Sequence, residues 1–180
     1  MKPFLRTLPI WLLASGAVSL AEDNPLSANT RLVYTGMKNI LLRTAEKVPE
    51  ENYGFKPTDA VRSFGQIVGH VADASYMFCS VALGEKNPAP RVEQTKTTKA
   101  DLTAALKGAF AYCDRAYDGM TDAAAAQTVN LFGREMPRLG VLNVNVVHTS
   151  EHYGNLVTYM RLKNVVPPTS EPGFEPVPKK

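Results

Sequence analysis

The segment PRLGVLNVNVVHTSEHYGNLVTYMRLK, residues Pro137–Lys163, decides the fold class. Mostly apolar side chains recur in it at spacings of three and four residues, which is the period of a helix with one buried face. They are Leu139, Leu142, Val146, Thr149, Tyr153, Leu156 and Met160. A proline at the start suits the first turn of a helix. The segment therefore predicts one long amphipathic helix.

Three other segments, residues 27–48, 63–84 and 98–120, show the same period. The first carries Val33, Met37, Ile40, Leu41 and Val48 on one face. Ser63 and Gln66 have the spacing of a capping box, in which a hydroxyl and an amide satisfy free N–H groups at a helix start. The connecting stretches are polar, and within the irregular one at 121–137 a short extended piece is expected at 129–132. Four amphipathic helices predict an all-α four-helix bundle over residues 22–166.

Two of the three histidines lie on a second line of residues along the 137–163 helix, beside its apolar face. This line consists of Val141, Asn145, His148, His152, Asn155 and Tyr159. Each buried polar group left without a partner costs roughly 1–3 kcal/mol, so we expect a partner for this polar line. Its polar members are predicted to line a pocket.

A divalent metal ion is the partner that the histidines favour. His148 and His152 lie four residues apart, so their Cβ atoms stand ~5–6 Å apart and both imidazoles can bind one ion. The only other histidine, His70, falls at a similar height on the 63–84 helix, with Asp73 and Met77 on its face. Three protein ligands and one open position are typical of catalytic zinc. The alternative is three hydrogen-bonded core histidines without a metal.

A second motif overlaps the histidine pair. His148, Glu151 and His152 match the H-x-x-E-H string of inverted zinc peptidases, in which Glu151 would be the general base. Those enzymes need a further acidic ligand well downstream, and only 28 residues follow His152. Glu151 is therefore expected beside the site. Asp73 is the other carboxylate that could orient a histidine or move a proton.

The stretches RSFGQIVGHVADASYMFC (Arg62–Cys79) and HTSEHYGNLVTYMRLKNVVPP (His148–Pro168) resemble the DinB/YfiT-like superfamily. The resemblance implies a four-helix bundle, often dimeric, with a metal site between its second and fourth helices. It places the ligands at His70, His148 and His152 and implies zinc or nickel as the cofactor. Characterised relatives include thiol S-transferases, and others are named metal-dependent hydrolases. The implied partner is a small-molecule substrate or a thiol, with a homodimer as a further expectation.

The same resemblance bears on the two cysteines, because the second and third helices of this family can run parallel. Parallel helices would bring Cys79 and Cys113 to similar heights, whereas antiparallel helices would separate them by ~16 Å, too far for a disulfide. The cysteines can therefore pair, and two small buried thiols remain the alternative.

Residues 1–21 are typical of a cleaved secretory signal peptide. Lys2 and Arg6 precede an apolar run from Leu8 to Val18, which is shorter than the ~20 residues of a membrane span. We expect export to the periplasm or the exterior, with no membrane attachment after cleavage. Without the leader, acids and bases nearly balance, so nucleic-acid binding is not expected. The proline-rich end, residues 167–180, is predicted to be a flexible tail.

The predicted function is that of an exported metalloprotein, either a metal-dependent hydrolase or a thiol S-transferase. Export disfavours thiol transfer, because the characterised transferases work in the cytosol, where small thiols are abundant. The alternative is a non-catalytic, stress-related bundle that binds a metal or another ligand. A pocket sealed by Met77 and Tyr159 would favour that alternative.

Overall fold

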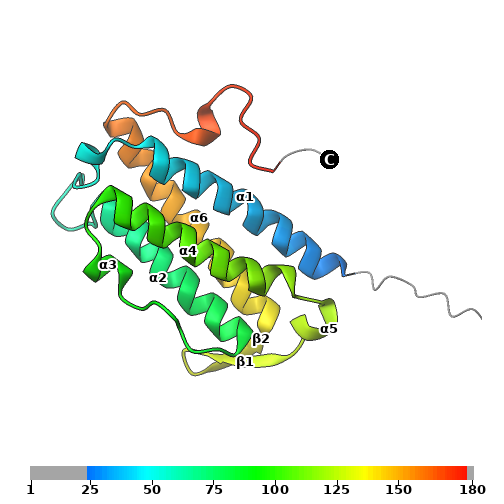
Figure 1. The fold of residues 1–180 in the computed structure, drawn as a ribbon. Coiled ribbons are helices and arrows are strands. Elements are labelled where there is room, and N and C mark those ends of the chain that lie inside the picture. Colours follow the sequence, from blue (N-terminus) through cyan, green and yellow to red (C-terminus); the bar gives the residue numbers. More distant parts are fainter. Residues whose placement is uncertain (1–23, 178–180) are drawn as a thin grey trace, which may run out of the picture.

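The computed structural model describes residues 24–177 and confirms the predicted all-α four-helix bundle. The four long helices are α1 (Pro25–Lys47), α2 (Phe64–Leu83), α4 (Lys99–Asp118) and α6 (Arg138–Leu162) (Figure 1). The short elements are η1 (Glu50–Asn52), α3 (Val92–Thr95), α5 (Asp122–Ala125), β1 (Thr128–Leu131), β2 (Arg134–Pro137) and η2 (Pro168–Ser170). The predicted signal peptide, residues 1–21, lies outside the described residues.

The long helices run in two opposed pairs. In Figure 1, α1 and α6 run in one direction along the bundle, and α2 and α4 run in the other. α2 packs against α4 and α6, and α1 packs against the same two helices. The bundle therefore has a parallel neighbouring pair, α2 and α4, and an antiparallel pair, α2 and α6.

The predicted helix ends are formed by the predicted residues. The Ser63 hydroxyl accepts a hydrogen bond from the Gln66 backbone N–H, and the Gln66 side-chain oxygen accepts one from the Ser63 backbone N–H, which completes the capping box. Gly84 ends α2 in the left-handed region, with φ 71°. The Thr98 hydroxyl caps α4 by accepting from the Asp101 N–H. These local contacts fix where each helix begins and ends.

The seam of α6 lies in the core as predicted, with Leu142, Leu156 and Met160 almost fully buried. One predicted core position of α1 is wrong. Val33 is 48% exposed, and the neighbouring Tyr34 is buried and stacks on Tyr117 with ring centroids 3.7 Å apart. A stacked aromatic pair buries more apolar surface than a valine can, which explains the shift by one position.

The expected extended piece becomes one strand of an antiparallel hairpin, in which Leu131 pairs with Arg134. The two turn residues, Phe132 and Gly133, both have positive φ values, 53° and 81°. A two-residue turn with this geometry matches the twist of the flanking strands. The exposed ring of Phe132 packs edge-on against Phe78 of α2, with centroids 6.3 Å apart.

Because α2 and α4 run parallel, the two cysteines lie at the same height and can form a disulfide. Cys79 and Cys113 form a disulfide, with their Cα atoms 5.3 Å apart. This separation lies in the ordinary range for a disulfide. The bond joins the C-terminal halves of the two helices, and both cysteines are fully buried.

The proline-rich end lies along α1. The Asn39 amide donates to the Pro176 carbonyl at 2.7 Å, and Glu171 pairs with Arg43 and Lys47. Flexibility of residues 167–180 stays a prediction. No helix within residues 24–177 combines the length and the apolar character that a membrane crossing requires.

Candidate metal centre

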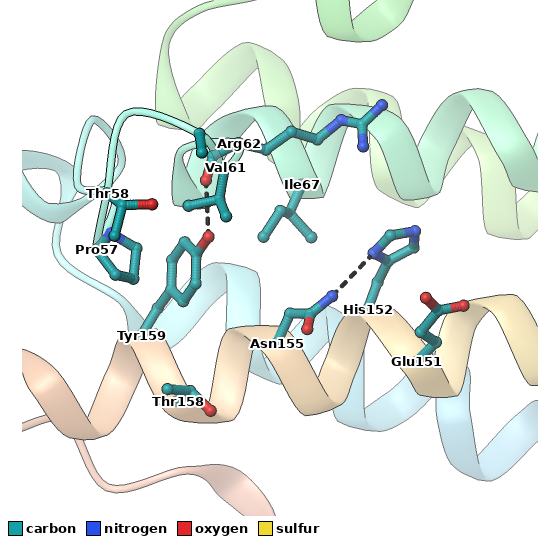
Figure 2. Close-up of a pocket in the computed structure, with 11 residues that line it drawn as sticks. Pro57, Thr58, Val61, Arg62, Ile67, Glu151, His152, Asn155, Thr158 and Tyr159 are labelled. Carbon is teal, nitrogen blue, oxygen red and sulfur yellow. Dashed lines mark hydrogen bonds between the residues drawn. The ribbon is translucent and has the colours of Figure 1, made fainter.

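The C-terminal half of α6 forms one wall of a cleft, and the loop that precedes α2 faces it (Figure 2). The cleft has a volume of 520 Å³ and is lined by Glu151, His152, Asn155 and Tyr159 of α6. The structure thus brings together four of the residues that the sequence selected on this helix. Arg62 lines the cleft from the opposing loop.

Asn145 lies elsewhere, and its expected place in the pocket is wrong. It is 1% exposed in the core, where its amide donates to the Tyr117 hydroxyl at 3.0 Å. Its amide nitrogen also lies 3.8 Å from the sulfur of Cys79. Tyr117 of α4 packs against this end of the polar line, so the cleft lies beside the C-terminal half only.

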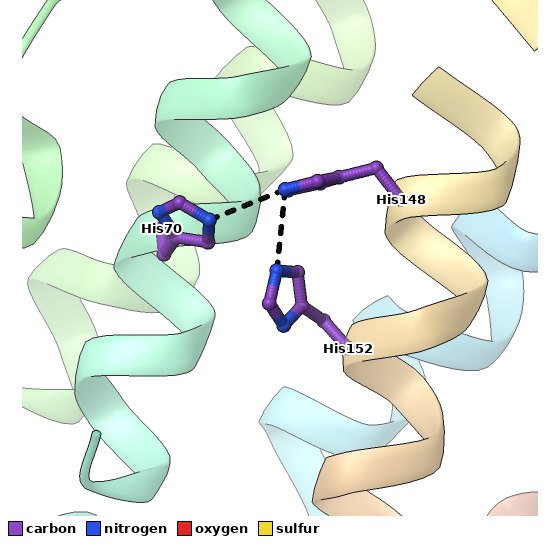
Figure 3. Close-up of side chains that lie close together, drawn as sticks. All are labelled: His70, His148 and His152. Carbon is purple, nitrogen blue, oxygen red and sulfur yellow. Dashed lines mark hydrogen bonds between the residues drawn. The ribbon is translucent and has the colours of Figure 1, made fainter. Parts of the chain in front are cut away.

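The three histidines converge between α2 and α6 (Figure 3). Nε2 of His148 lies 3.2 Å from Nε2 of His70 and 3.2 Å from Nε2 of His152. One potential ligand atom from each histidine lies within 4.8 Å of the others. Helical spacing sets the His148–His152 pair, and the packing of α2 against α6 brings His70 to it.

The two separations about His148 fit a tetrahedral metal ion. Nitrogens bound at ~2.0–2.1 Å in a tetrahedral site lie ~3.3 Å apart, close to the two separations observed. Hydrogen bonds explain the geometry less well. A neutral imidazole nitrogen has one lone pair, so Nε2 of His148 cannot accept from both neighbours at once. A cation between the rings would use all three lone pairs.

The electrostatics of the site keep these lone pairs free. Burial lowers the pKa of all three imidazoles below the ordinary value of 6.5. The Arg62 charge and the neighbouring imidazoles lower each pKa further, and Glu93 and Glu151 oppose the shift. The histidines are therefore neutral at neutral pH, the state that binds a metal.

The outer nitrogen of His70 has a carboxylate partner that sequence patterns did not reveal. Oε2 of Glu93 lies 3.3 Å from Nδ1 of His70. A carboxylate at this nitrogen keeps the proton on Nδ1 and leaves Nε2 free as a ligand. Glu93 belongs to α3, a single turn inside the stretch that was expected to be a polar loop.

Asp73, which was expected beside the site, lines a cleft together with His70 and His148, and its carboxylate holds α3 in place. Its two carboxylate oxygens accept hydrogen bonds from the N–H groups of Val92 and Glu93, at 2.7 and 2.9 Å. The turn also lies close to α2 at Gly69, where a Cβ atom would lie 2.8 Å from the Glu93 Cα. Gly69 and Asp73 thus fix the backbone from which Glu93 reaches His70.

The other two histidines have different outer partners. Nδ1 of His152 lies 3.5 Å from the Asn155 side-chain amide. Nδ1 of His148 is buried and has no hydrogen-bond partner among residues 24–177. His70 is therefore the histidine with a charged positioning partner.

A second cleft, of 420 Å³, opens on the other side of the histidines. His70 and His148 line it together with Met77, Arg91 and Phe132. Met77 and Tyr159 line separate clefts and do not seal the site. A small molecule can therefore reach His152 through the first cleft and His70 and His148 through the second.

The fold and this site define a helical-bundle protein with a candidate three-histidine metal centre between two antiparallel helices. The sequence model of the DinB superfamily matches residues 34–156, a range that includes all three histidines. The chain belongs to the DinB superfamily.

Known relatives have the same architecture. The chain is 25% identical over 127 residues to the uncharacterized protein YjoA of Bacillus subtilis, a match that covers 69% of this chain and 82% of YjoA. A DinB-like protein from Bacillus cereus superposes with a TM-score of 0.67 at 16% identity, over 74% of this chain and 90% of that one. The structure of YjoA superposes with a TM-score of 0.63 at 20% identity, over 76% and 92%. These structures share the fold.

Proposed function

We propose that the protein binds one divalent metal ion, zinc or nickel, through His70, His148 and His152, and that it catalyses a hydrolytic reaction on a small molecule. The proposed metal site rests on one observation. Three neutral imidazoles from two helices converge, with Nε2 of His148 3.2 Å from Nε2 of both His70 and His152 and all three ligand atoms within 4.8 Å of one another. A divalent ion held there supplies Lewis-acid chemistry that activates a water molecule or a thiol as a nucleophile.

The surroundings support catalysis rather than storage of a metal. Clefts reach the histidines from two sides, so a substrate can approach them. Glu151 lines the first cleft beside His152, where it can accept a proton from an attacking water. A bundle that only stored a metal would need neither the open clefts nor this carboxylate.

Hydrolysis is favoured over thiol transfer by the proposed location of the protein. The leader pattern in residues 1–21 supports export, and the disulfide between Cys79 and Cys113 supports an oxidising compartment. Small reduced thiols are scarce under such conditions. Thiol S-transfer remains the second candidate, because the superfamily resemblance includes enzymes of that kind.

The test is metal content per chain, measured by elemental mass spectrometry on protein purified without a histidine tag. We expect about one zinc or nickel ion per chain, and loss of the metal in His70→Ala and His148→Ala. Val147→Ala is the matched control, because Val147 is 67% exposed next to His148 and should keep the metal. Protein that folds but takes up no divalent metal after reconstitution would contradict the proposal. Metal-loaded protein is then screened for hydrolysis and for thiol transfer.

A further inference from the structure

Arg62 is held from two sides at the wall of the first cleft. Its Nε donates a hydrogen bond to Oε1 of Glu93 at 2.8 Å, and its backbone carbonyl accepts one from the Tyr159 hydroxyl at 2.8 Å. In Figure 2 its side chain runs from the loop along α2, to the side of the cleft on which His152 lies. An arginine anchored at both ends loses little conformational freedom when it binds a ligand.

The terminal nitrogens of this guanidinium are available. Within residues 24–177, every hydrogen bond and ion pair of the Arg62 side chain is made through Nε, and 45% of the side chain is exposed. The remaining N–H groups form a planar fork whose geometry matches a carboxylate. Glu93 bonds to Arg62 through one oxygen and lies against His70 through the other, so one carboxylate separates the fork from a candidate metal ligand.

The charges around the cleft select a ligand with a single negative charge. Arg62 and Glu151 are the charged residues in its lining, and Glu93 lies behind Arg62. A divalent ion on three neutral imidazoles would leave the cleft with a small positive excess. A dianion such as a phosphate would meet the two carboxylates, whereas one carboxylate group can pair with the fork.

We propose that Arg62 binds a carboxylate group of the substrate, whose reacting group then faces the three histidines. The substrate class is a small carboxylic acid with a hydrolysable group a short distance from the acid. This inference rests on the proposed metal site, and it adds the substrate class and a residue that determines specificity.

The test uses cobalt(II)-loaded protein and matched pairs of metal-binding probes. Succinate monohydroxamate carries a carboxylate, and butyrohydroxamate is its neutral counterpart of the same length. Malonate monohydroxamate and propionohydroxamate form a shorter pair, so that two distances between the carboxylate and the metal-binding group are tested. Dissociation constants are read from the change in the cobalt absorption bands, and cobalt retention is checked by gel filtration.

We expect the better carboxylate probe to bind at least about tenfold more tightly than its neutral counterpart, as a charge-assisted hydrogen bond supplies. Arg62→Gln should abolish this preference and leave the affinity for the neutral probe within about twofold. Arg91→Gln, on the wall of the second cleft, is the matched control and should keep the preference. Arg62→Lys preserves the charge beside Glu93 without the planar fork, and should lose at least about threefold of the preference.

Each other result would overturn the inference. Equal affinity for both members of each pair, an unchanged preference in Arg62→Gln or Arg62→Lys, or a loss confined to Arg91→Gln would show that Arg62 does not select a carboxylate. The cobalt stoichiometry separates this failure from that of the proposed function. Protein that retains cobalt without a preference refutes the substrate class alone, and protein that retains no cobalt refutes the metal site and the inference together.

Discussion

Oε2 of Glu93 lies 3.3 Å from Nδ1 of His70, on the ring nitrogen opposite the one that faces His148. The carboxylate therefore sets which nitrogen of His70 carries the proton and which is free to bind a metal. Glu93 is held in turn by contacts that α2 makes with α3.

Glu93→Gln should weaken metal binding by about 10–100-fold, because an outer carboxylate orients its histidine and raises the basicity of the ligand nitrogen. The measurement is a zinc dissociation constant from competition with a chromophoric chelator. Glu151→Gln is the matched control, since the same change is made beside the same histidines without a contact to an outer ring nitrogen. Equal losses in the two variants would argue for a general charge effect and against positioning by Glu93.

Gly69→Ala should lower the free energy of unfolding by about 1–3 kcal/mol, since the new methyl group cannot be accommodated without a shift of α3. A Cβ atom at this position would lie 2.8 Å from the Glu93 Cα, which is backbone and cannot rotate away. Metal affinity should fall as well, because Glu93 moves with its backbone. Gly154→Ala, with no atom within 4 Å of its Cβ position, should lower neither the free energy of unfolding in urea nor the affinity for zinc.

Asp73→Asn should cost about 1 kcal/mol of stability and should also weaken zinc binding. Each oxygen of the native carboxylate accepts a backbone N–H of α3, and an asparagine offers only one acceptor oxygen. Chemical denaturation and chelator competition measure the two effects. Asp59→Asn changes a fully exposed carboxylate and should alter neither quantity. An Asp73 variant with native zinc affinity would show that α3 stays in place without this cap.

The metal-free protein should lose stability as the pH falls below 6.5. The pKa of each histidine is lowered in the folded state, chiefly by burial, so the unfolded chain takes up protons first. The stabilising contribution is complete above pH 6.5 and is lost as the pH falls from that value through the lowered pKa values. Urea unfolding in chelator-treated protein between pH 8 and pH 5 measures the effect, since carboxyl groups with ordinary pKa values of about 3.9–4.3 are still mostly ionised at pH 5.

Replacement of all three histidines by asparagine should flatten that pH dependence. The chain contains no other histidine, so no further imidazole titrates in this window. A slope that survives the triple substitution would assign the pH dependence to other groups.

Reduction of the disulfide, or replacement of both cysteines by serine, should lower the free energy of unfolding by about 2–4 kcal/mol. The bond closes a loop between residues 34 apart in sequence and so restricts the unfolded chain. Peptide mapping without reductant should recover the Cys79 and Cys113 peptides as one linked species. Recovery of two free thiols from oxidised protein would contradict the pairing.

Local patterns in the sequence determined the helices and the pairing of two histidines. The capping box at Ser63 and the glycine at 84 mark the ends of α2 because they satisfy backbone groups within a few residues. The spacing of His148 and His152 follows from helical geometry alone. Arg62 lies within a recognisable motif, yet its role depends on Glu93, 31 residues further along.

The tertiary structure decided which residues meet across helices. A periodic pattern shows which residues share one face of a helix, but it does not show which other segment packs against that face. Asn145 and Asn155 share such a face, yet Asn145 contacts Tyr117 in the core and Asn155 lines a cleft. Glu93 reaches His70 only because α3 folds back onto α2 through Asp73 and Gly69. The sequence alone determined the all-α bundle and the His148–His152 pair, since both follow from patterns a few residues long, whereas His70 joins the pair only through the packing of α2 against α6. The parallel course of α2 and α4 and the partners of each histidine depend on packing between distant segments, which no local pattern encodes.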